Sequence, residues 1–173
     1  KGVSMKYDYI LVRYGEIALK GRNRYRFENI LIQNIRSVLK DLTKIKVSKT
    51  YGRIYIELND HPYEKIIDRL KNVFGLFSFS PVKKTILEIE NIKEASLEIM
   101  KKSLSKSNTF KVETRRPYKN FPLKSPDVSD EIGAHILRNT EDLTVDVHHP
   151  DTTLTIEIRE EGAFIYSEII YGV

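Results

Sequence analysis

The sequence predicts an α+β fold built from two small domains in tandem. Two kinds of hydrophobic pattern alternate along its 173 residues. Runs in which every second residue is apolar are typical of half-buried strands, and runs with apolar residues three or four apart are typical of helices. Glycine turns separate these runs, as at Tyr51-Gly52 and Glu161-Gly162. With 40% hydrophobic residues, the chain can bury roughly 70% of its extended surface.

Six elements predict the first domain, which we place at residues 5–80. Apolar alternation marks four strands, and helical spacing marks two helices. In chain order we expect a strand at 7–13, a helix capped by Asn23 and reaching Val38, a hairpin over 45–47 and 54–58, a helix from Asp60-Pro62 to Gly75, and a strand at 77–79. This order of strand, helix, strand, strand, helix, strand (βαββαβ) is that of a ferredoxin-like unit.

The second domain is placed at residues 81–173 and is predicted to be α/β. A helix is expected over residues 92–104, then a strand from Phe110, in which Phe110, Val112 and Thr114 alternate with polar residues. Ser125 is a good N-cap for a second helix, and Pro126 suits its first position. Alternating apolar residues then predict three strands, at 143–147, 154–158 and 164–170.

The segment from residue 115 to residue 124 interleaves cations with aromatic residues. Cations bind phosphate oxygens and aromatic rings stack on unpaired bases, which are the contacts that proteins make with single-stranded RNA. The alternatives are a solvated surface loop for the cations, and packing beneath the loop for Tyr118 and Phe121. The candidate RNA-binding residues of this strand and loop are Lys111, Arg115, Arg116, Tyr118, Lys119, Asn120, Phe121 and Lys124.

A second candidate segment lies before the first helix. Lys20 and Arg22 flank Gly21, where the backbone can approach an RNA phosphate closely. Both are therefore candidate RNA-binding residues. The alternatives are that Gly21 only makes a turn, and that Glu16 and Lys20 pair with each other or across the domain interface.

Composition excludes several other functions. The 29 Lys and Arg residues exceed the 24 Asp and Glu residues, so the net charge of +5 suits an anionic partner. The absence of cysteine excludes disulfides, thiolate metal sites and cysteine-borne sulfur chemistry within these residues. His148-His149 is expected to be a polar strand end and Glu160-Glu161 a hairpin tip, so we predict no catalytic, cofactor or metal residues. Without a membrane span or signal peptide, a cytoplasmic location is expected.

Two motifs carry a resemblance to a known family. Phe110-Lys-Val-Glu-Thr-Arg-Arg116, with Phe121-Pro-Leu-Lys-Ser125 and the helix at Glu131-Ile-Gly-Ala134, resembles the THUMP domain of tRNA 4-thiouridine synthetase, the tRNA sulfurtransferase. Arg13-Tyr-Gly-Glu-Ile-Ala-Leu-Lys-Gly-Arg-Asn23 is similar to the opening of the same enzyme's N-terminal ferredoxin-like domain. The motifs occur in the expected order, and the resemblance covers most of the chain.

The resemblance implies the tRNA-recognition part of an enzyme that thiolates uridine 8 of tRNA with ATP and a sulfur donor. It also implies binding to the acceptor stem and the 3′-CCA end. In the family a PP-loop domain adenylates the uridine, and the 173 residues contain no phosphate loop of that kind. We therefore expect an N-terminal fragment that is not catalytic by itself. ATP with magnesium, a cysteine desulfurase, a homodimer and thiamine biosynthesis are expected of the full-length enzyme only.

Two alternative functions stay open. The chain could be the RNA-binding module of another THUMP-containing enzyme, such as a tRNA methyltransferase or pseudouridine synthase, although the motif from Arg13 to Asn23 argues against this. A ferredoxin-like fold could also be a regulatory or protein-interaction module, because a fold does not fix a function. RNA titration against salt separates the last alternative, since only a basic RNA binder loses affinity steeply with salt.

Overall fold

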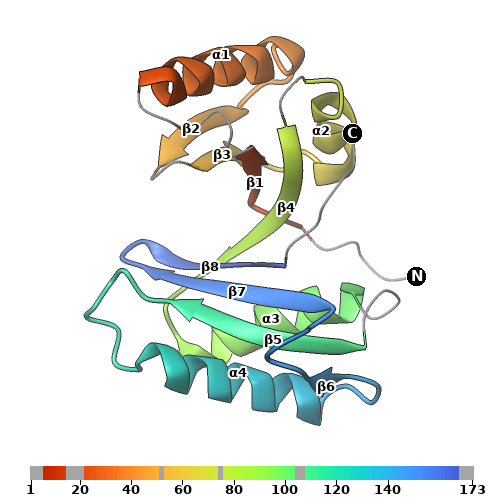
Figure 1. Cartoon of the computed structure of the whole chain (residues 1–173), viewed down its shortest axis with the longest axis vertical. Coiled ribbons are helices and arrows are strands. Elements are labelled where there is room, and N and C mark those ends of the chain that lie inside the picture. Colours follow the sequence, from red (N-terminus) through yellow and green to blue (C-terminus); the bar gives the residue numbers. More distant parts are fainter. Residues whose placement is uncertain (1–5, 15–21, 51–52, 74–75, 104–107, 168–173) are drawn as a thin grey trace. The chain divides into compact units, whose positions relative to one another are not determined.

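The computed structural model describes residues 6–14, 22–50, 53–73, 76–103 and 108–167. The chain divides into two compact units, and the division falls between Pro81 and Val82. Figure 1 shows that each unit combines helices with a sheet. The elements follow in the order that the sequence predicts, so the α+β prediction is confirmed.

The first unit contains the six predicted ferredoxin-like elements. These are β1 (Tyr9–Tyr14), α1 (Arg22–Val38), β2 (Lys46–Thr50), β3 (Arg53–Glu57), α2 (Tyr63–Leu70) and β4 (Leu76–Thr85). β3 pairs antiparallel with both β1 and β2, so that Ile56 lies opposite Ile10 on one side and Val47 on the other. The order βαββαβ is therefore confirmed.

Both helices of the first unit bury one apolar side against the strands. Alternate residues of β1 and β3 point into the same core, because successive side chains of a strand face opposite ways. The fully buried members of this core are Ile10, Val12, Ile35, Ile54, Ile56, Leu58, Ile66 and Leu70. Although α2 is short, the spacing of Ile66, Ile67 and Leu70 puts all three on one side of the helix, and their burial holds it against the core.

The second unit contains α3 (Ile89–Ser103), β5 (Thr109–Arg115), α4 (Ser125–Arg138), β6 (Thr144–Val145), β7 (Thr152–Arg159) and β8 (Gly162–Ser167). The end of β4 pairs antiparallel with β8, and β8 pairs antiparallel with β7. β5 lies between β7 and β6 and is parallel to both. A parallel pair needs a crossover connection, and α4 supplies it after β5.

α4 packs on β5 with a narrow apolar side. Val128, Ile132 and Ile136 are completely buried and are spaced four residues apart, as predicted. Gly133 lies over the strand, where a Cβ atom would be 4.0 Å from Cγ2 of Val112. Val112 therefore belongs to the helix-covered face of the sheet.

The structure corrects the start of α4. Lys124 holds the N-cap position in an extended conformation, and Ser125, predicted as the N-cap, is the first helical residue. No side chain caps the helix. Proline fits anywhere in the first turn, because those N–H groups have no partner within the helix, so Pro126 does not fix the boundary to a single residue.

The strand predicted over residues 143–147 is also too long. β6 comprises only Thr144–Val145, and Val147 is exposed beyond it. The carboxylate of Asp146 accepts hydrogen bonds from the backbone N–H groups of His148 and His149, at 3.1 and 3.0 Å. Such local bonds turn the chain, and they end the strand where apolar alternation alone predicts that it continues.

The second helix and the last strand of the first unit also differ from the prediction. α2 ends at Leu70, and the predicted end at Gly75 lies outside the described residues. β4 runs past Pro81 to Thr85, whereas the predicted strand ends at residue 79. Proline marks a strand end in most sequences because it lacks an N–H donor, which is why the pattern underestimates β4.

Candidate nucleic-acid interface

The basic loop (residues 116–124) joins the end of β5 to the start of α4. Because β5 and β7 are parallel, with Arg115 opposite Glu157, the loop leaves the sheet at the end where β7 turns into β8 (Figure 1). The backbone N–H of Tyr118 donates a hydrogen bond to the carbonyl oxygen of Ile158, at 3.0 Å. The first part of the loop is thereby attached to the end of β7.

Arg116 binds the loop itself. Its Nη1 donates hydrogen bonds to two backbone carbonyl oxygens, that of Lys119 at 2.8 Å and that of Phe121 at 3.4 Å. The residue is half-buried. The sequence predicts Arg116 as a phosphate ligand, but in the structure part of its donor capacity is used inside the loop.

The two aromatic residues of the basic loop differ in exposure. Phe121 is buried, with 7% of its surface exposed, so its ring packs in the protein interior. Of the two alternatives left open for Phe121, packing is therefore the one that the structure favours. Tyr118 is half-buried and keeps part of its surface in contact with solvent. Tyr118 is thus the aromatic residue of this loop that is available to an unpaired base.

The remaining candidates of the basic loop are open to solvent. Arg115, Lys119, Asn120 and Lys124 are all exposed. Within the described part of the chain, none of the three cations forms an ion pair. An acid, Asp127, lies in the first turn of α4 and complements the helix dipole, so anions are favoured on the loop and not at the helix end.

Strand register brings further charged residues to the same end of the sheet. Arg115, Glu157, Phe164 and Lys84 are cross-strand partners, one from each of β5, β7, β8 and β4. Arg115 is three residues beyond Val112, so this row lies on the face opposite to α4. Lys84 was not among the predicted site residues, because sequence alone gives no signal that aligns it with Arg115.

Arg159, also absent from the prediction, is held firmly beside this row. Its Nη2 and Nε donate to Oε1 of Glu157, at 2.6 and 3.1 Å, and its guanidinium lies 4.4 Å from the centre of the Phe164 ring. The hydroxyl of Tyr166 donates to the other oxygen of Glu157 at 2.7 Å. Glu157 therefore neutralises Arg159, whereas Arg115 keeps its charge available.

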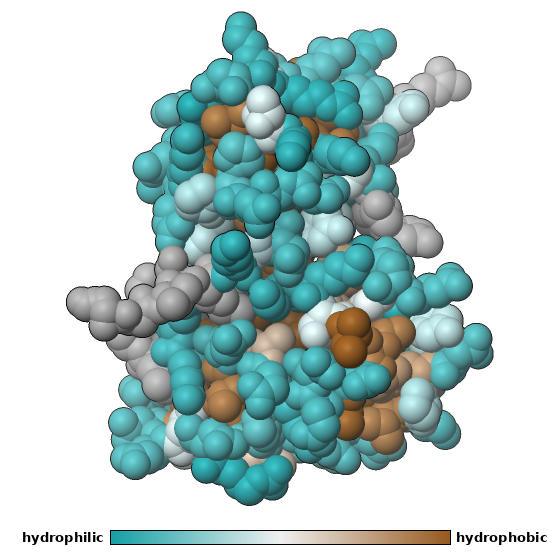
Figure 2. Space-filling view, turned by 180° about the vertical axis from the view of Figure 1, so that it is seen from behind, coloured by the Kyte–Doolittle hydropathy of each residue, from teal (hydrophilic) through white to brown (hydrophobic). Residues whose placement is uncertain are grey.

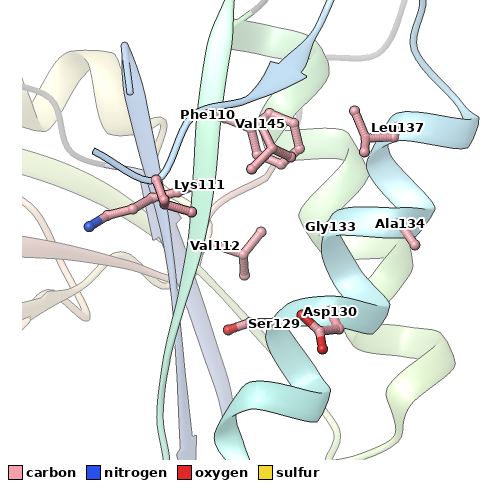
Figure 3. Close-up of a pocket in the computed structure, with 10 residues that line it drawn as sticks. Phe110, Lys111, Val112, Ser129, Asp130, Gly133, Ala134, Leu137 and Val145 are labelled. Atoms are coloured by element: carbon pink, nitrogen blue, oxygen red, sulfur yellow. The ribbon is translucent and has the colours of Figure 1, made fainter. Parts of the chain in front are cut away.

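Lys111 lies apart from the basic loop. Figure 3 shows its side chain on the opposite side of β5 from Val112, and it lies four positions before Arg115, about 13 Å along the strand. On the Val112 side, α4, β5 and β6 line an open pocket of about 410 Å³, to whose lining Lys111 also belongs although its side chain points away. Its lining is mainly apolar and includes the acidic side chain of Asp130, so the pocket does not suit phosphate groups.

The structure describes little of the N-terminal candidate segment. Lys20 lies outside the described residues, and so does the side chain of Arg22, although Arg22 begins α1. The acid Glu28, in the second turn of α1, is buried. It receives a hydrogen bond from the Tyr14 hydroxyl and ion pairs with Arg24 at 3.3 Å and Lys49 at 3.4 Å.

These contacts set the titration of the Glu28 cluster (Tyr14, Arg24, Glu28 and Lys49). Burial raises the pKa of the Glu28 carboxyl, but the hydrogen bonds from Tyr14, Arg24 and Lys49 outweigh it and hold the pKa below its usual range. Burial and the bond to Glu28 together raise the pKa of Tyr14 well above its usual value. At neutral pH Glu28 is thus ionised, and it fixes α1 to β1 and β2.

Other kinds of site find no support among the described residues. No group of three or more His, Cys, Asp or Glu side chains there is placed to hold a metal ion. No helix in the described ranges has the length and apolar character needed to cross a membrane. Figure 2 shows a mostly hydrophilic face with apolar side chains gathered in its lower half.

Comparison with known families agrees with this arrangement. The model of the ThiI ferredoxin-like domain matches residues 9–80, and the THUMP domain model matches residues 88–168. Proteins named "Probable tRNA sulfurtransferase" from Thermoanaerobacter sp. (strain X514) and Moorella thermoacetica are 50% and 49% identical over 166 residues, which is 96% of this chain. The chain belongs to the tRNA sulfurtransferase family. It spans 43% and 42% of the length of these two tRNA sulfurtransferases.

Solved structures give the same assignment. A crystal structure described as a 4-thiouridine synthetase–RNA complex with bound ATP matches 95% of the chain with a TM-score of 0.79 and 36% identity, and 42% of that chain is covered. A protein of Pyrococcus horikoshii matches 95% of the chain with a TM-score of 0.74 and 34% identity, and 55% of it is covered. The predicted family, with a ferredoxin-like unit and a THUMP domain in this order, is confirmed.

Proposed function

We propose that this part of a tRNA sulfurtransferase binds tRNA, and that the basic loop and the adjacent Arg115 make the main contact. The observation that carries the proposal is an ordered loop whose exposed cations have no ion-pair partner within the described residues. Cations that bind RNA phosphates release counterions, which favours binding. Cations without an ion-pair partner can do so without first breaking a contact within the protein. The family assignment supports tRNA as the ligand, since one family member was crystallised with RNA.

The contact is with the acceptor stem and the unpaired 3′-CCA end. Duplex RNA hides its base edges in a deep and narrow groove, so an aromatic side chain beside cations suits an unpaired strand better. Tyr118 is the available stacking surface, while Arg115, Lys119 and Lys124 are exposed in the same segment and can bind phosphates. Phe121 supports the loop from beneath and contributes no exposed ring.

The complete enzyme thiolates uridine 8 of the tRNA that this part holds. ATP with magnesium, the sulfur-carrying cysteine and the contact with a cysteine desulfurase belong to sequence beyond these 173 residues, which contain no cysteine. The full-length enzyme is a cytoplasmic homodimer. The bound ATP in the related RNA complex supports the use of ATP, and the relatives, of which this chain spans less than half, support further sequence that carries the chemistry.

Salt titration of variants tests the RNA contact. Replacing Arg115, Lys119 and Lys124 together by Ala lowers the slope of log K against log salt by about 2, because each phosphate contact to a single strand contributes about 0.7. The matched control replaces three exposed cations of the same unit, Lys101, Lys102 and Arg138, and keeps the parent slope. Equal slopes for the two triple variants would exclude the basic loop as the RNA site.

A second experiment tests the 3′ end. Fluorescence anisotropy compares an acceptor minihelix with the same minihelix lacking CCA, at one salt concentration. Stacking of one base is worth roughly 1 to 3 kcal/mol, so the truncated RNA binds about tenfold more weakly or worse. Equal affinities would leave only recognition of the stem.

A further inference from the structure

Arg116 turns two carbonyl groups of the basic loop toward one point. Its guanidinium binds the backbone oxygens of Lys119 and Phe121, three and five residues further along the chain. Hydrogen bonds from a charged donor are about twice as strong as neutral ones. A single side chain thus closes the loop upon itself.

Few other contacts define the middle of the basic loop. Its first part is held by the bond from the Tyr118 N–H to Ile158, and its last part by α4, where the Val128 N–H donates to the carbonyl oxygen of Lys124. Between these attachments lie the exposed residues Lys119 and Asn120, followed by the buried Phe121, whose ring also anchors the loop. The bond from Arg116 to the carbonyl oxygen of Lys119 is the link that the structure gives to this stretch.

We infer that Arg116 is a positioning residue, which braces the basic loop so that Lys119 and Lys124 face the RNA at a fixed spacing. This inference rests on the proposed RNA contact, but it assigns Arg116 a different role from that of its neighbours. Arg115, Lys119 and Lys124 contribute charge to RNA binding, and Arg116 holds the conformation of the loop. A loop that is already ordered loses less conformational entropy when it binds.

Arginine is specifically required for such a brace. The planar guanidinium presents several N–H donors in fixed directions and can hold two acceptors at once, whereas the ammonium of lysine is a compact point charge on a flexible stem. Arg116→Lys therefore keeps the charge and removes the brace. Arg115→Lys is the matched control, because the neighbouring Arg115 is exposed and its side chain forms no hydrogen bond or ion pair among the described residues.

Hydrogen exchange without RNA gives the first readout. The Tyr118 amide is the reporter, because its bond to Ile158 is lost when the loop opens. In Arg116→Lys this amide exchanges about tenfold faster, since a hydrogen bond to a charged group stabilises by about that factor. It is unchanged in Arg115→Lys. Amides within β7 and β8 stay protected in both variants and show that the unit is folded, and unchanged Tyr118 exchange in Arg116→Lys would overturn the inference.

Binding to a tRNA acceptor minihelix gives the second readout. Arg116→Lys binds about tenfold more weakly than the parent with the same salt slope, because the charges remain and only their arrangement is lost. Parent-like affinity of Arg116→Lys, or a slope reduced by about 0.7 in Arg116→Ala, would identify a phosphate ligand and overturn the positioning role. If the parent itself binds no tRNA, the proposed function fails, and the exchange experiment still decides whether Arg116 braces the loop.

Discussion

Gly162 lies so close to Thr85 that a Cβ atom at Gly162 would be 2.8 Å from the Thr85 carbonyl oxygen. The same glycine has a φ of +149°, which residues with a side chain rarely adopt. It follows the Glu160-Glu161 turn between β7 and β8, and it lies beside the end of β4. The strand pairing that supports the basic loop therefore depends on a residue without a side chain.

Gly162→Ala is expected to destabilise the protein by about 1 to 3 kcal/mol, because it combines backbone strain with a steric clash. Urea unfolding measures the change. Gly133→Ala is the control, since the nearest atom to its Cβ would be 4.0 Å away and alanine favours a helix over glycine by roughly 0.5 to 1 kcal/mol. Similar midpoints for the two variants would contradict this reading of Gly162.

Tyr118 and Phe121 are expected to respond differently to truncation. Tyr118→Ala weakens RNA binding by roughly 1 to 3 kcal/mol through the lost stacking surface, with little change in the free energy of unfolding. Phe121→Ala removes a buried ring and lowers the free energy of unfolding by about 3 kcal/mol. Chemical denaturation and anisotropy on both variants provide the comparison. A Tyr118→Ala protein with parent affinity would show that this ring does not stack on RNA.

The Glu28 cluster predicts a loss of stability in acid. The folded-state pKa of Glu28 lies below that of an unfolded glutamate, so the ionised carboxylate stabilises the fold above the unfolded-state pKa, and the contribution is lost as the pH falls through the folded-state pKa. Glu28→Gln removes this contribution, and it costs roughly 1 to 3 kcal/mol at pH 7. Unfolding curves at pH 7 and pH 3 should therefore differ more for the parent than for Glu28→Gln. If the stability of the parent and of Glu28→Gln changed equally between pH 7 and pH 3, Glu28 would not be the cause of the loss of stability in acid.

The 173 residues alone are expected to bind tRNA without modifying it. They contain no cysteine to carry sulfur, so incubation with tRNA, ATP and a sulfur donor should give no 4-thiouridine. The measurement is the near-ultraviolet absorbance of the purified tRNA, with a complete tRNA sulfurtransferase as the positive control. Formation of 4-thiouridine by these residues would require a different account of the sulfur transfer.

The periodic parts of the fold are predictable from the sequence. Val128, Ile132 and Ile136 recur at helical spacing and are all buried, and the apolar alternation predicts β7, in which the intervening Thr155 and Glu157 are buried as well. Element ends are less predictable, because they depend on single local bonds. Val147 continues an apolar alternation, yet hydrogen bonds to the Asp146 carboxylate end the strand before it.

The candidate site is predictable only in part. Composition identifies the basic loop, but it does not distinguish Arg116, bound to carbonyl oxygens, from Arg115, which is exposed. The two arginines are adjacent, and their difference comes from three-dimensional contacts. The same holds for Lys84, which aligns with Arg115 only through the register of four strands.

The hydrogen bond between Tyr118 and Ile158 joins positions about 40 residues apart in the order of translation. Synthesis proceeds at roughly 5 to 20 residues per second, so Ile158 is made about 2 to 8 seconds after Tyr118. The basic loop of a nascent chain therefore lacks its attachment to the sheet until β7 has left the ribosome. The RNA contact proposed for this loop is thus complete only when the second unit is nearly complete.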